Sequence, residues 1–365
     1  MNRPLPFLLF FVMLVCSGCK AAETVRVQHS FDSYLRQMES TEHFSGAALV
    51  MREGKILHAR GYGAATGDRA NGIDTKFHVA SITKQFTAAA IMRLAEQGVV
   101  KLDGSINTYL PVGYRSPKWD AVTVHQLLSH TSGIPDYAVA RDYYRLAKGF
   151  GLDGTVDRML KEAMEKDLEF APGSRYAYSN LGYTLLGSII ENQTGASYAE
   201  YVKRAILDPV GMTSSSIHVA SHVPAEDEAE GLRWNDELAM RVPDDAETLP
   251  ATAPDGGLIT TLADFARWTR IFTAAGQTIL SPGSIRLMTT PHVRIGNGGP
   301  LDSMGYGLFI GDRLVGHGGL IVGFRSQFIF DRETRSVIAV FSNDASNDAQ
   351  QIAFGLLTIL LTADT

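Results

Sequence analysis

The chain has 365 residues, of which 45% are hydrophobic, and a formal net charge of −6. This length and composition suit one large globular domain, or two ordinary ones, with a substantial core. The acidic balance and the lack of a dense lysine and arginine cluster argue against nucleic acid as a partner.

The N-terminal residues read as a targeting segment. An apolar run at residues 7–15 is too short to span a bilayer as a helix but has the length of a signal-peptide core. The following Cys16-Ser17-Gly18-Cys19 resembles a bacterial lipoprotein cleavage site with Cys19 as the lipidated residue. We therefore expect a lipoprotein-type signal peptide at 1–18, a tether at 19–29 and export to the periplasm. A plain secretory signal is the alternative. Both cysteines lie here, so the mature chain can form no disulfide.

Strands are expected at both ends of the remaining chain and helices in its middle. Residues 44–64 read as two strands around a Glu53-Gly54 turn. Helical spacing, capping residues and stop signals then predict a series of helices, at 81–98, 123–129, 180–193, 198–207 and 261–273. Late apolar or alternating runs predict four strands and a closing helix, at 306–310, 314–317, 323–331, 336–342 and 350–361.

This order predicts an α/β fold of the α+β kind, in which an antiparallel sheet built from both chain ends is flanked by helices. The domain is expected to cover 30–362, with a mostly helical subdomain inserted at about 95–250 and a cleft between the two parts. No G-x-G-x-x-G opens a helix and no G-x-x-x-x-G-K-[ST] occurs, so a dinucleotide or phosphate-loop fold is not expected.

Ser81-Ile82-Thr83-Lys84 opens the first predicted helix. Positions i and i+3 of a helix share a face, so the lysine amine is expected beside the serine hydroxyl. Serine needs a base to act as a nucleophile, and lysine can be that base if burial lowers its pKa. Alone the motif is weak, and a capping serine followed by a surface lysine is the simpler interpretation.

Two further segments could complete a site. Tyr178-Ser179-Asn180 precedes an apolar helix. The Tyr178 phenol could relay a proton if a nearby ammonium lowers the pKa of that phenol. The Asn180 amide could hold a substrate carbonyl. His317-Gly318-Gly319 is expected to end a strand, where glycines allow a substrate to approach closely. The backbone N–H groups of Ser81 and Leu320 could form an oxyanion hole. Taken alone, the first segment could equally be a buried tyrosine followed by a helix-capping asparagine, and the second could be a histidine in a turn.

Together the three segments resemble the serine beta-lactamase and penicillin-binding protein superfamily, especially its class C-like branch, in which S-x-x-K, Y-x-N and K-T-G or a variant follow in this order. Flanking sequences over about 30–360 are also similar, at Phe77–Lys84, Thr123–Pro135, Phe170–Gly173, Asp208–Met212 and Gly256–Ile259. The resemblance implies a beta-lactamase/transpeptidase-like fold and acyl transfer that needs no metal or other cofactor.

The resemblance also implies a role for each matching residue. Ser81 would be the acylated nucleophile and Lys84 its general base or electrostatic partner. Tyr178 would relay a proton, and Asn180 would bind the substrate amide. His317 stands where the family carries lysine, so the permanent charge that would hold a substrate carboxylate is missing.

These residues predict a serine hydrolase acting on beta-lactams or on D-amino-acid peptide and amide bonds. A small molecule or peptide is the expected partner, with membrane contact only through the lipid anchor. Two alternatives remain open, a carboxylesterase for small esters and a sensor that penicillin acylates without turnover. Arg325 is a candidate for the charge that His317 lacks.

Other motifs read as structural. His218 and His222 are accompanied by no third zinc ligand in the sequence and no H-E-x-x-H glutamate, so a packed or solvated pair is expected and no metal site. Ser197 lies in a near match to the G-x-S-x-G elbow, but this follows a helix, and we expect it to cap the next one. The acidic run at 226–230 reads as an exposed loop.

Overall fold

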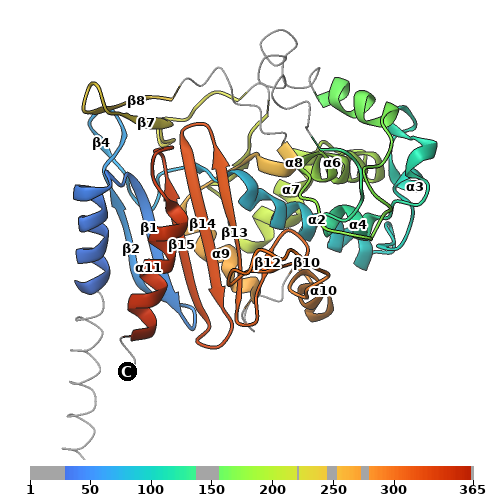
Figure 1. Cartoon of the computed structure of the whole chain (residues 1–365). Helices are drawn as coiled ribbons and strands as arrows, with labels where there is room; N and C mark the ends of the chain where they lie inside the picture. The colour runs from blue at the N-terminus through green and yellow to red at the C-terminus, as the bar shows by residue number, and fades with distance from the viewer. Residues whose placement is uncertain (1–28, 137–155, 220–221, 245–252, 273–278, 363–365) are drawn as a thin grey trace, which may run out of the picture.

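The computed structural model describes residues 29–136, 156–219, 222–244, 253–272 and 279–362 (Figure 1). Its largest element is an eight-stranded sheet in the order β10-β11-β12-β13-β14-β15-β1-β2, with every neighbouring pair antiparallel. The strands are β1 (Gly46–Arg52), β2 (Lys55–Tyr62), β10 (Val293–Arg294), β11 (Ser303–Met304), β12 (Phe309–Ile310), β13 (Leu314–Ile321), β14 (Phe324–Asp331) and β15 (Ser336–Ser342).

The two ends of the described chain meet inside this sheet. Strand β1 pairs with β15 along its whole length, from Gly46 opposite Ser342 to Arg52 opposite Ser336. The expected antiparallel sheet built from both chain ends is thereby confirmed.

Both faces of the sheet are covered, which explains why its strands read as continuous apolar runs. Successive residues of a strand point to opposite faces. In β1, Ala48 and Val50 pack with the helix at 29–41 and with α11 (Ala349–Thr362), whereas Ala47 and Leu49 join the larger core with α9 (Leu262–Trp268). Figure 1 shows α11 in front of the strands and the helical region to their right.

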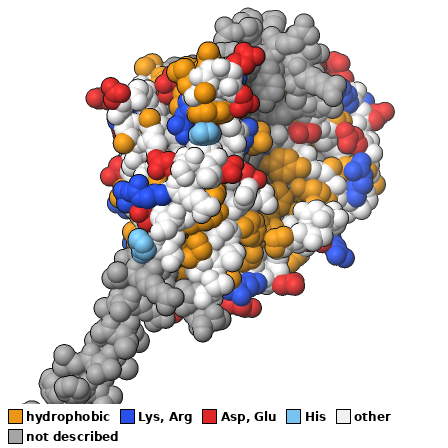
Figure 2. Space-filling model, turned by 60° about the vertical axis from the view of Figure 1, so that its left-hand side comes forward, with side chains coloured by type: hydrophobic (Ala, Val, Ile, Leu, Met, Phe, Trp, Pro, Cys, Tyr) orange, Lys and Arg blue, Asp and Glu red, His pale blue; other side chains and the backbone are white. Residues whose placement is uncertain are grey.

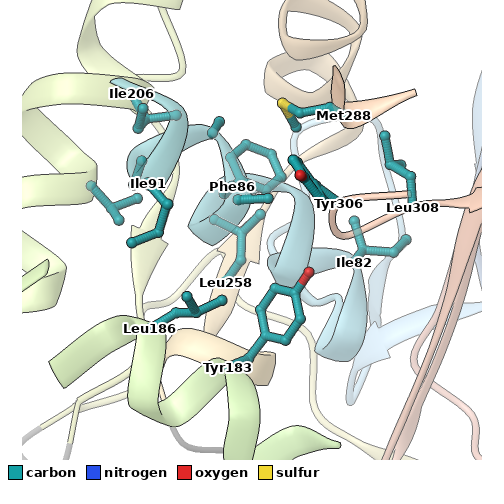
Figure 3. Packing of buried hydrophobic residues seen from close by; sticks show 14 of the residues in the cluster. Ile82, Phe86, Ile91, Tyr183, Leu186, Ile206, Leu258, Met288, Tyr306 and Leu308 are labelled. Carbon is teal, nitrogen blue, oxygen red and sulfur yellow. The ribbon is translucent and has the colours of Figure 1, made fainter. Parts of the chain in front are cut away.

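That region is assembled around α2 (Lys84–Glu96). Figure 3 shows Phe86 and Ile91 of α2 packed among Tyr183 and Leu186 of α6 and Ile206. The other helices are α3 (Ile106–Tyr109), α4 (Val124–Leu128), a helix at 156–165, α6 (Asn180–Thr194), α7 (Tyr198–Val202), a π-helical turn (Lys203–Leu207), α8 (Ala253–Gly256) and α10 (Pro282–Met288). Single-turn 3-10 segments lie at Ala80–Thr83, Val112–Tyr114, Pro117–Trp119, Asp208–Val210 and Thr269–Phe272.

Three small sheets complete the fold. They pair β3 (Ala64–Thr66) with β4 (Arg69–Ala70), β9 (Leu258–Thr260) with both β5 (Phe77–His78) and β6 (Ser216–Ile217), and β7 (Leu232–Asn235) with β8 (Met240–Pro243). Strands β6, β7 and β8 therefore interrupt the region expected to be mostly helical.

Local signals set the helix ends. Thr123 caps α4 and Ser197 caps α7, each in a capping box, as expected. Gly195 ends α6 in the left-handed conformation with φ of 67°. Several boundaries differ from expectation. Ser81 lies in a 3-10 turn that precedes α2, and β13 runs past His317 to Ile321. The strand expected at 306–310 is only Phe309–Ile310, and the helices expected at 198–207 and 261–273 end as α-helices at 202 and 268.

The surface mixes both signs of charge. Figure 2 shows acidic and basic side chains interspersed on the face displayed, beside an area of hydrophobic side chains. No helix among the described residues has the length and apolar character needed to cross a membrane.

Candidate active site

Residues on both sides of Ser81 in the sequence hold its turn in place through hydrogen bonds and burial. Ala80 adopts φ of 48°, which costs a non-glycine residue about 1–2 kcal/mol. The Val79 N–H donates to Leu258 O at 3.1 Å, and Thr83 Oγ1 donates to Ala80 O at 2.6 Å. Ile82 is fully buried in the core (Figure 3), so Ser81 is left half-buried between anchored neighbours.

Lys84 is completely buried beneath Ser81. Its Nζ donates to Ser81 Oγ at 3.1 Å, to Asn180 Oδ1 at 2.8 Å and to the Asp255 carbonyl oxygen at 2.8 Å. Burial lowers the pKa of Lys84 to about 8, against the opposing pull of the Asp255 and Asp136 carboxylates. The expected pairing of amine and hydroxyl is present, and the amine has the lowered pKa that a general base requires.

The Tyr178 ring forms another wall of this arrangement. Lys84 Nζ lies 4.9 Å from the ring centroid, and the His130 ring stacks on Tyr178 at 4.4 Å. Burial raises the pKa of the phenol, although a hydrogen bond with the Ser81 side chain acts in the opposite direction. The pKa of the phenol is therefore raised and not lowered, because the loss of solvent is the largest effect on it. The phenol keeps its proton at pH 7 and can donate it.

Two residues outside the three motifs hold the Tyr178 segment in place. The Ser179 N–H donates to His130 Nδ1 at 3.0 Å, and the Leu181 N–H donates to Asp136 Oδ1 at 2.9 Å. His130 lies within the family-like stretch from Thr123, but only the fold shows its contact with Ser179. These bonds fix the start of α6, and with it the amide that accepts from Lys84.

His317 is neutral in this setting. Burial first, and then the charge of Lys84, lower its pKa to about 3. Its Nδ1 lies 2.5 Å from the Gly318 carbonyl oxygen, and its Nε2 has no hydrogen-bond partner among the described residues. The histidine therefore supplies no permanent positive charge, as the sequence led us to expect.

The backbone of β13 runs directly beside the Ser81 turn. A Cβ on Gly319 would lie 2.2 Å from both the Val79 carbonyl oxygen and Ser326 Oγ, so a side chain cannot be accommodated. Strand β12 pairs only with Val315 and Gly316 of β13. In the part of the chain that the structure describes, β13 beyond His317 thus has a free edge facing the pocket.

A pocket of about 760 Å³ brings the predicted residues together. It is lined by Ser81, Tyr178, Asn180, His317, Gly318, Gly319 and Leu320. Arg325 lines it too, and its Nη1 donates to the carbonyl oxygens of Ile321 and Phe324 at 2.8 Å. Ser197 lies elsewhere as a helix cap, and Cys19 is outside the described residues.

A family model described as Beta-lactamase matches residues 31–358. The chain belongs to the beta-lactamase family. Penicillin-binding protein 4* of Bacillus subtilis (strain 168) is 29% identical over 320 residues, 82% of this chain and 68% of that protein. Protein flp of Staphylococcus aureus (strain COL) is 30% identical over 206 residues, which are 55% of this chain and 40% of that protein.

Solved structures agree with this membership. The octameric penicillin-binding protein homologue from Pyrococcus abyssi is 28% identical with a TM-score of 0.81, over 92% of this chain and 77% of that one. The D-stereospecific amidohydrolase from Streptomyces sp. is 26% identical with a TM-score of 0.71, over 88% and 96%. The family and the fold, a mixed α/β architecture of the beta-lactamase/transpeptidase kind, are those that the motifs led us to expect, and they place this beta-lactamase-family chain among the serine hydrolases.

Proposed function

We propose that this chain hydrolyses D-amino-acid amide and peptide bonds through an acyl-enzyme on Ser81, with Lys84 as the base. The observation that carries the proposal is the buried Lys84 Nζ, 3.1 Å from Ser81 Oγ and with a pKa of about 8. An amine with this pKa is partly neutral at pH 7, whereas an exposed lysine is almost fully protonated.

The chemistry begins with attack on the substrate carbonyl carbon. Neutral Lys84 takes the Ser81 proton as Oγ forms the new bond, and the backbone N–H groups of Ser81 and Leu320 stabilise the oxyanion. The Tyr178 phenol protonates the leaving amine and regains a proton from the Lys84 ammonium. The C–N bond breaks and leaves an ester on Ser81. Water, deprotonated by Lys84, then attacks the ester carbonyl carbon. The C–O bond to Ser81 breaks, the acid is released, and the Lys84 ammonium returns its proton to Ser81 Oγ.

The neutral His317 favours substrates that carry no carboxylate at this position. Penicillins and D,D-peptides present such a carboxylate, while D-amino-acid amides do not. The similarity to a D-stereospecific amidohydrolase supports the same class. Arg325 is the remaining cation on the pocket wall, but its guanidinium already donates to two backbone carbonyls.

A carboxylesterase is the second candidate, because small esters also need no cation at His317. Turnover of p-nitrophenyl acetate compared with D-phenylalanine amide distinguishes the two. A kcat/KM at least tenfold higher for the amide than for its L-enantiomer, with no comparable preference among esters, supports the amidase. An ester-only activity supports the esterase.

The nucleophile is tested by intact-mass spectrometry after a fluorophosphonate probe and, separately, after benzylpenicillin. Wild type and Ser81→Ala are compared, with Ser197→Ala as the matched serine control. We expect one adduct that Ser81→Ala alone abolishes. A stable penicillin adduct without turnover of any substrate would instead indicate the sensor, and no adduct at all would refute acyl-enzyme chemistry.

We also propose that the protein is exported and lipidated at Cys19, as the sequence of its first residues suggests. Metabolic labelling with a fatty acid, in wild type and in Cys19→Ala, tests this directly. Label that depends on Cys19 supports the anchor, whereas an unlabelled wild type would refute it.

A further inference from the structure

Three histidines and a glutamate from separate segments meet outside the pocket. His78 belongs to β5, His218 and His222 follow β6, and Glu228 lies beside Lys76 in an isolated parallel bridge. One ring nitrogen of each histidine lies within 4.8 Å of the other two. None of the four residues lines the pocket around Ser81.

Glu228 is the centre of this cluster. Its carboxylate lies 2.8 Å from His78 Nε2 and 2.9 Å from His222 Nε2, and its side chain is only 4% exposed. Burial alone would raise the pKa of Glu228, but the hydrogen bonds with the two histidines hold it below its usual value. The expectation of an exposed acidic loop is wrong at this residue, which keeps a buried negative charge.

His218 completes the set. Its Nδ1 is buried and has no hydrogen-bond partner in the described parts of the chain. Its ring centroid lies 4.8 Å from that of His222 and 5.4 Å from that of His78.

We propose that His78, His218, His222 and Glu228 form a structural zinc site. Three imidazoles and one carboxylate are a donor set that zinc accepts in tetrahedral geometry. The cluster contains one nitrogen without a partner, on His218, and two nitrogens that face the Glu228 carboxylate. This arrangement is what we expect for such a donor set with no ion bound. The dication would also neutralise the buried Glu228 carboxylate.

The geometry requires a modest inward movement. Zinc–nitrogen bonds of about 2.1 Å place tetrahedral ligand atoms roughly 3.4 Å apart, closer than the present 4.8 Å limit. His78 is buried, whereas His218 and His222 are partly exposed, so the proposed movement falls on these two side chains. We expected no third candidate ligand beside this pair, but the fold brings His78 and Glu228 next to it.

The ion would tie together the segments behind the Ser81 turn. His78 pairs with Ile259 of β9, and the next residue, Val79, bonds to Leu258 before the chain turns into Ser81. The His218 N–H donates to the Gly257 carbonyl oxygen at 2.6 Å. Zinc would therefore brace the strand that leads into the turn. This role rests on the proposed function of Ser81, whereas the site itself does not.

The test uses tag-free purified protein, stripped with a chelator and titrated with ZnCl₂ or CoCl₂. Metal content, the visible absorption of cobalt and the Tm are measured for wild type, His218→Ala and Glu228→Gln. His292→Ala is the matched control, a half-buried histidine outside the cluster. His218→Ala breaks no hydrogen bond at Nδ1, so it should fold.

We expect about one zinc per chain in wild type and His292→Ala, a tetrahedral cobalt spectrum, and a Tm that zinc raises by several degrees. His218→Ala should lose the zinc-dependent rise, and Glu228→Gln should bind zinc at least tenfold more weakly. A stripped wild type that takes up no zinc would overturn the proposal, as would an equal Tm rise in His218→Ala. The rate of fluorophosphonate labelling is compared between zinc-loaded and stripped protein. This comparison tests, independently of zinc binding itself, whether the ion stabilises the turn that carries Ser81.

Discussion

Lys84 Nζ donates to Ser81 Oγ across 3.1 Å from a position with no solvent exposure. The two remaining protons of the ammonium go to the Asn180 side chain and the Asp255 carbonyl oxygen. The lysine is therefore fixed in direction, and its pKa is set by the protein around it. Changes in the charge or size of its neighbours should appear directly in the reactivity of Ser81.

Replacement of Lys84 by methionine should abolish the chemistry and preserve the fold. Methionine fills a similar space without the cost of a buried amine but leaves the acceptors of Asn180 and Asp255 without their donor, so Tm should fall by only a few degrees. General-base catalysis contributes about 10²- to 10⁴-fold, and the rate of fluorophosphonate labelling should fall by that amount. Lys101→Met, at an exposed lysine, is the control and should label like wild type. Labelling near the parental rate in Lys84→Met would remove this residue from the mechanism.

The acylation rate should increase with pH through the titration of Lys84. Only the neutral amine can accept the Ser81 proton, and with a pKa of about 8 roughly one tenth of it is neutral at pH 7. Labelling rates measured between pH 6 and 10 should rise about tenfold per unit at first and level off above pH 8. Tyr178→Phe should lower the rate but keep the same midpoint. A rate that is flat from pH 7 to 9 would contradict this assignment.

A lysine at position 317 should change both substrate preference and the pH profile. His317→Lys places a cation in the pocket, so kcat/KM for D-peptides with a free carboxylate should rise at least tenfold relative to D-amino-acid amides. The same cation should lower the pKa of Lys84 below its wild-type value, because these positions are close enough for the Lys84 charge to lower the pKa of His317, and a permanent like charge at 317 would disfavour the Lys84 ammonium. His317→Gln, which is neutral, should keep the parental preference. An unchanged ratio in His317→Lys would show that this position does not contact the carboxylate.

The two glycines of β13 should respond differently to alanine. At Gly319 a Cβ meets the Val79 carbonyl oxygen, which is backbone and cannot move away, so Gly319→Ala should cost about 1–3 kcal/mol in the free energy of unfolding. It should also displace the Ser81 turn and lower kcat. At Gly318 the nearest atom is the end of the Gln327 side chain, at 3.0 Å, which can rotate. The free energy of unfolding of both variants is measured with denaturant. Equal losses in Gly318→Ala and Gly319→Ala would show that the contact with Val79 does not cause the destabilisation.

Much of the site could be predicted because its chemistry is carried by short motifs. Ser81 and Lys84 are near in sequence, and Tyr178 and Asn180 flank one residue, so local spacing already places each pair. The contacts made by His130 and Asp136 could not be predicted in this way. Both side chains accept hydrogen bonds from backbone N–H groups in residues 179–181, which are distant from them in the sequence. Only the packing of the folded chain brings these groups together.

The elements of the fold could likewise be predicted where local signals determine them. Hydrophobic periodicity and caps such as Thr123 gave the correct elements, because both are local effects. The start of α2 was misplaced because a 3-10 turn and an α-helical turn differ little in sequence pattern. The neighbours of His218 could not be predicted, because His78 is far from it in the chain and because Glu228, although close in sequence, belongs to a run whose charge indicates an exposed loop. Burial of Glu228 depends on those partners, which composition alone cannot show.

The pairing of β1 with β15 also constrains how the protein is made. The core strand β1 has no neighbour on one side until residues 336–342 have left the ribosome. Contacts between such distant residues are slow to form, and the earlier segments stay open while the rest of the chain is synthesised. The native sheet therefore closes only after β15 has been synthesised, and a chain that stops short of β15 would leave the edge of β1 available for aggregation.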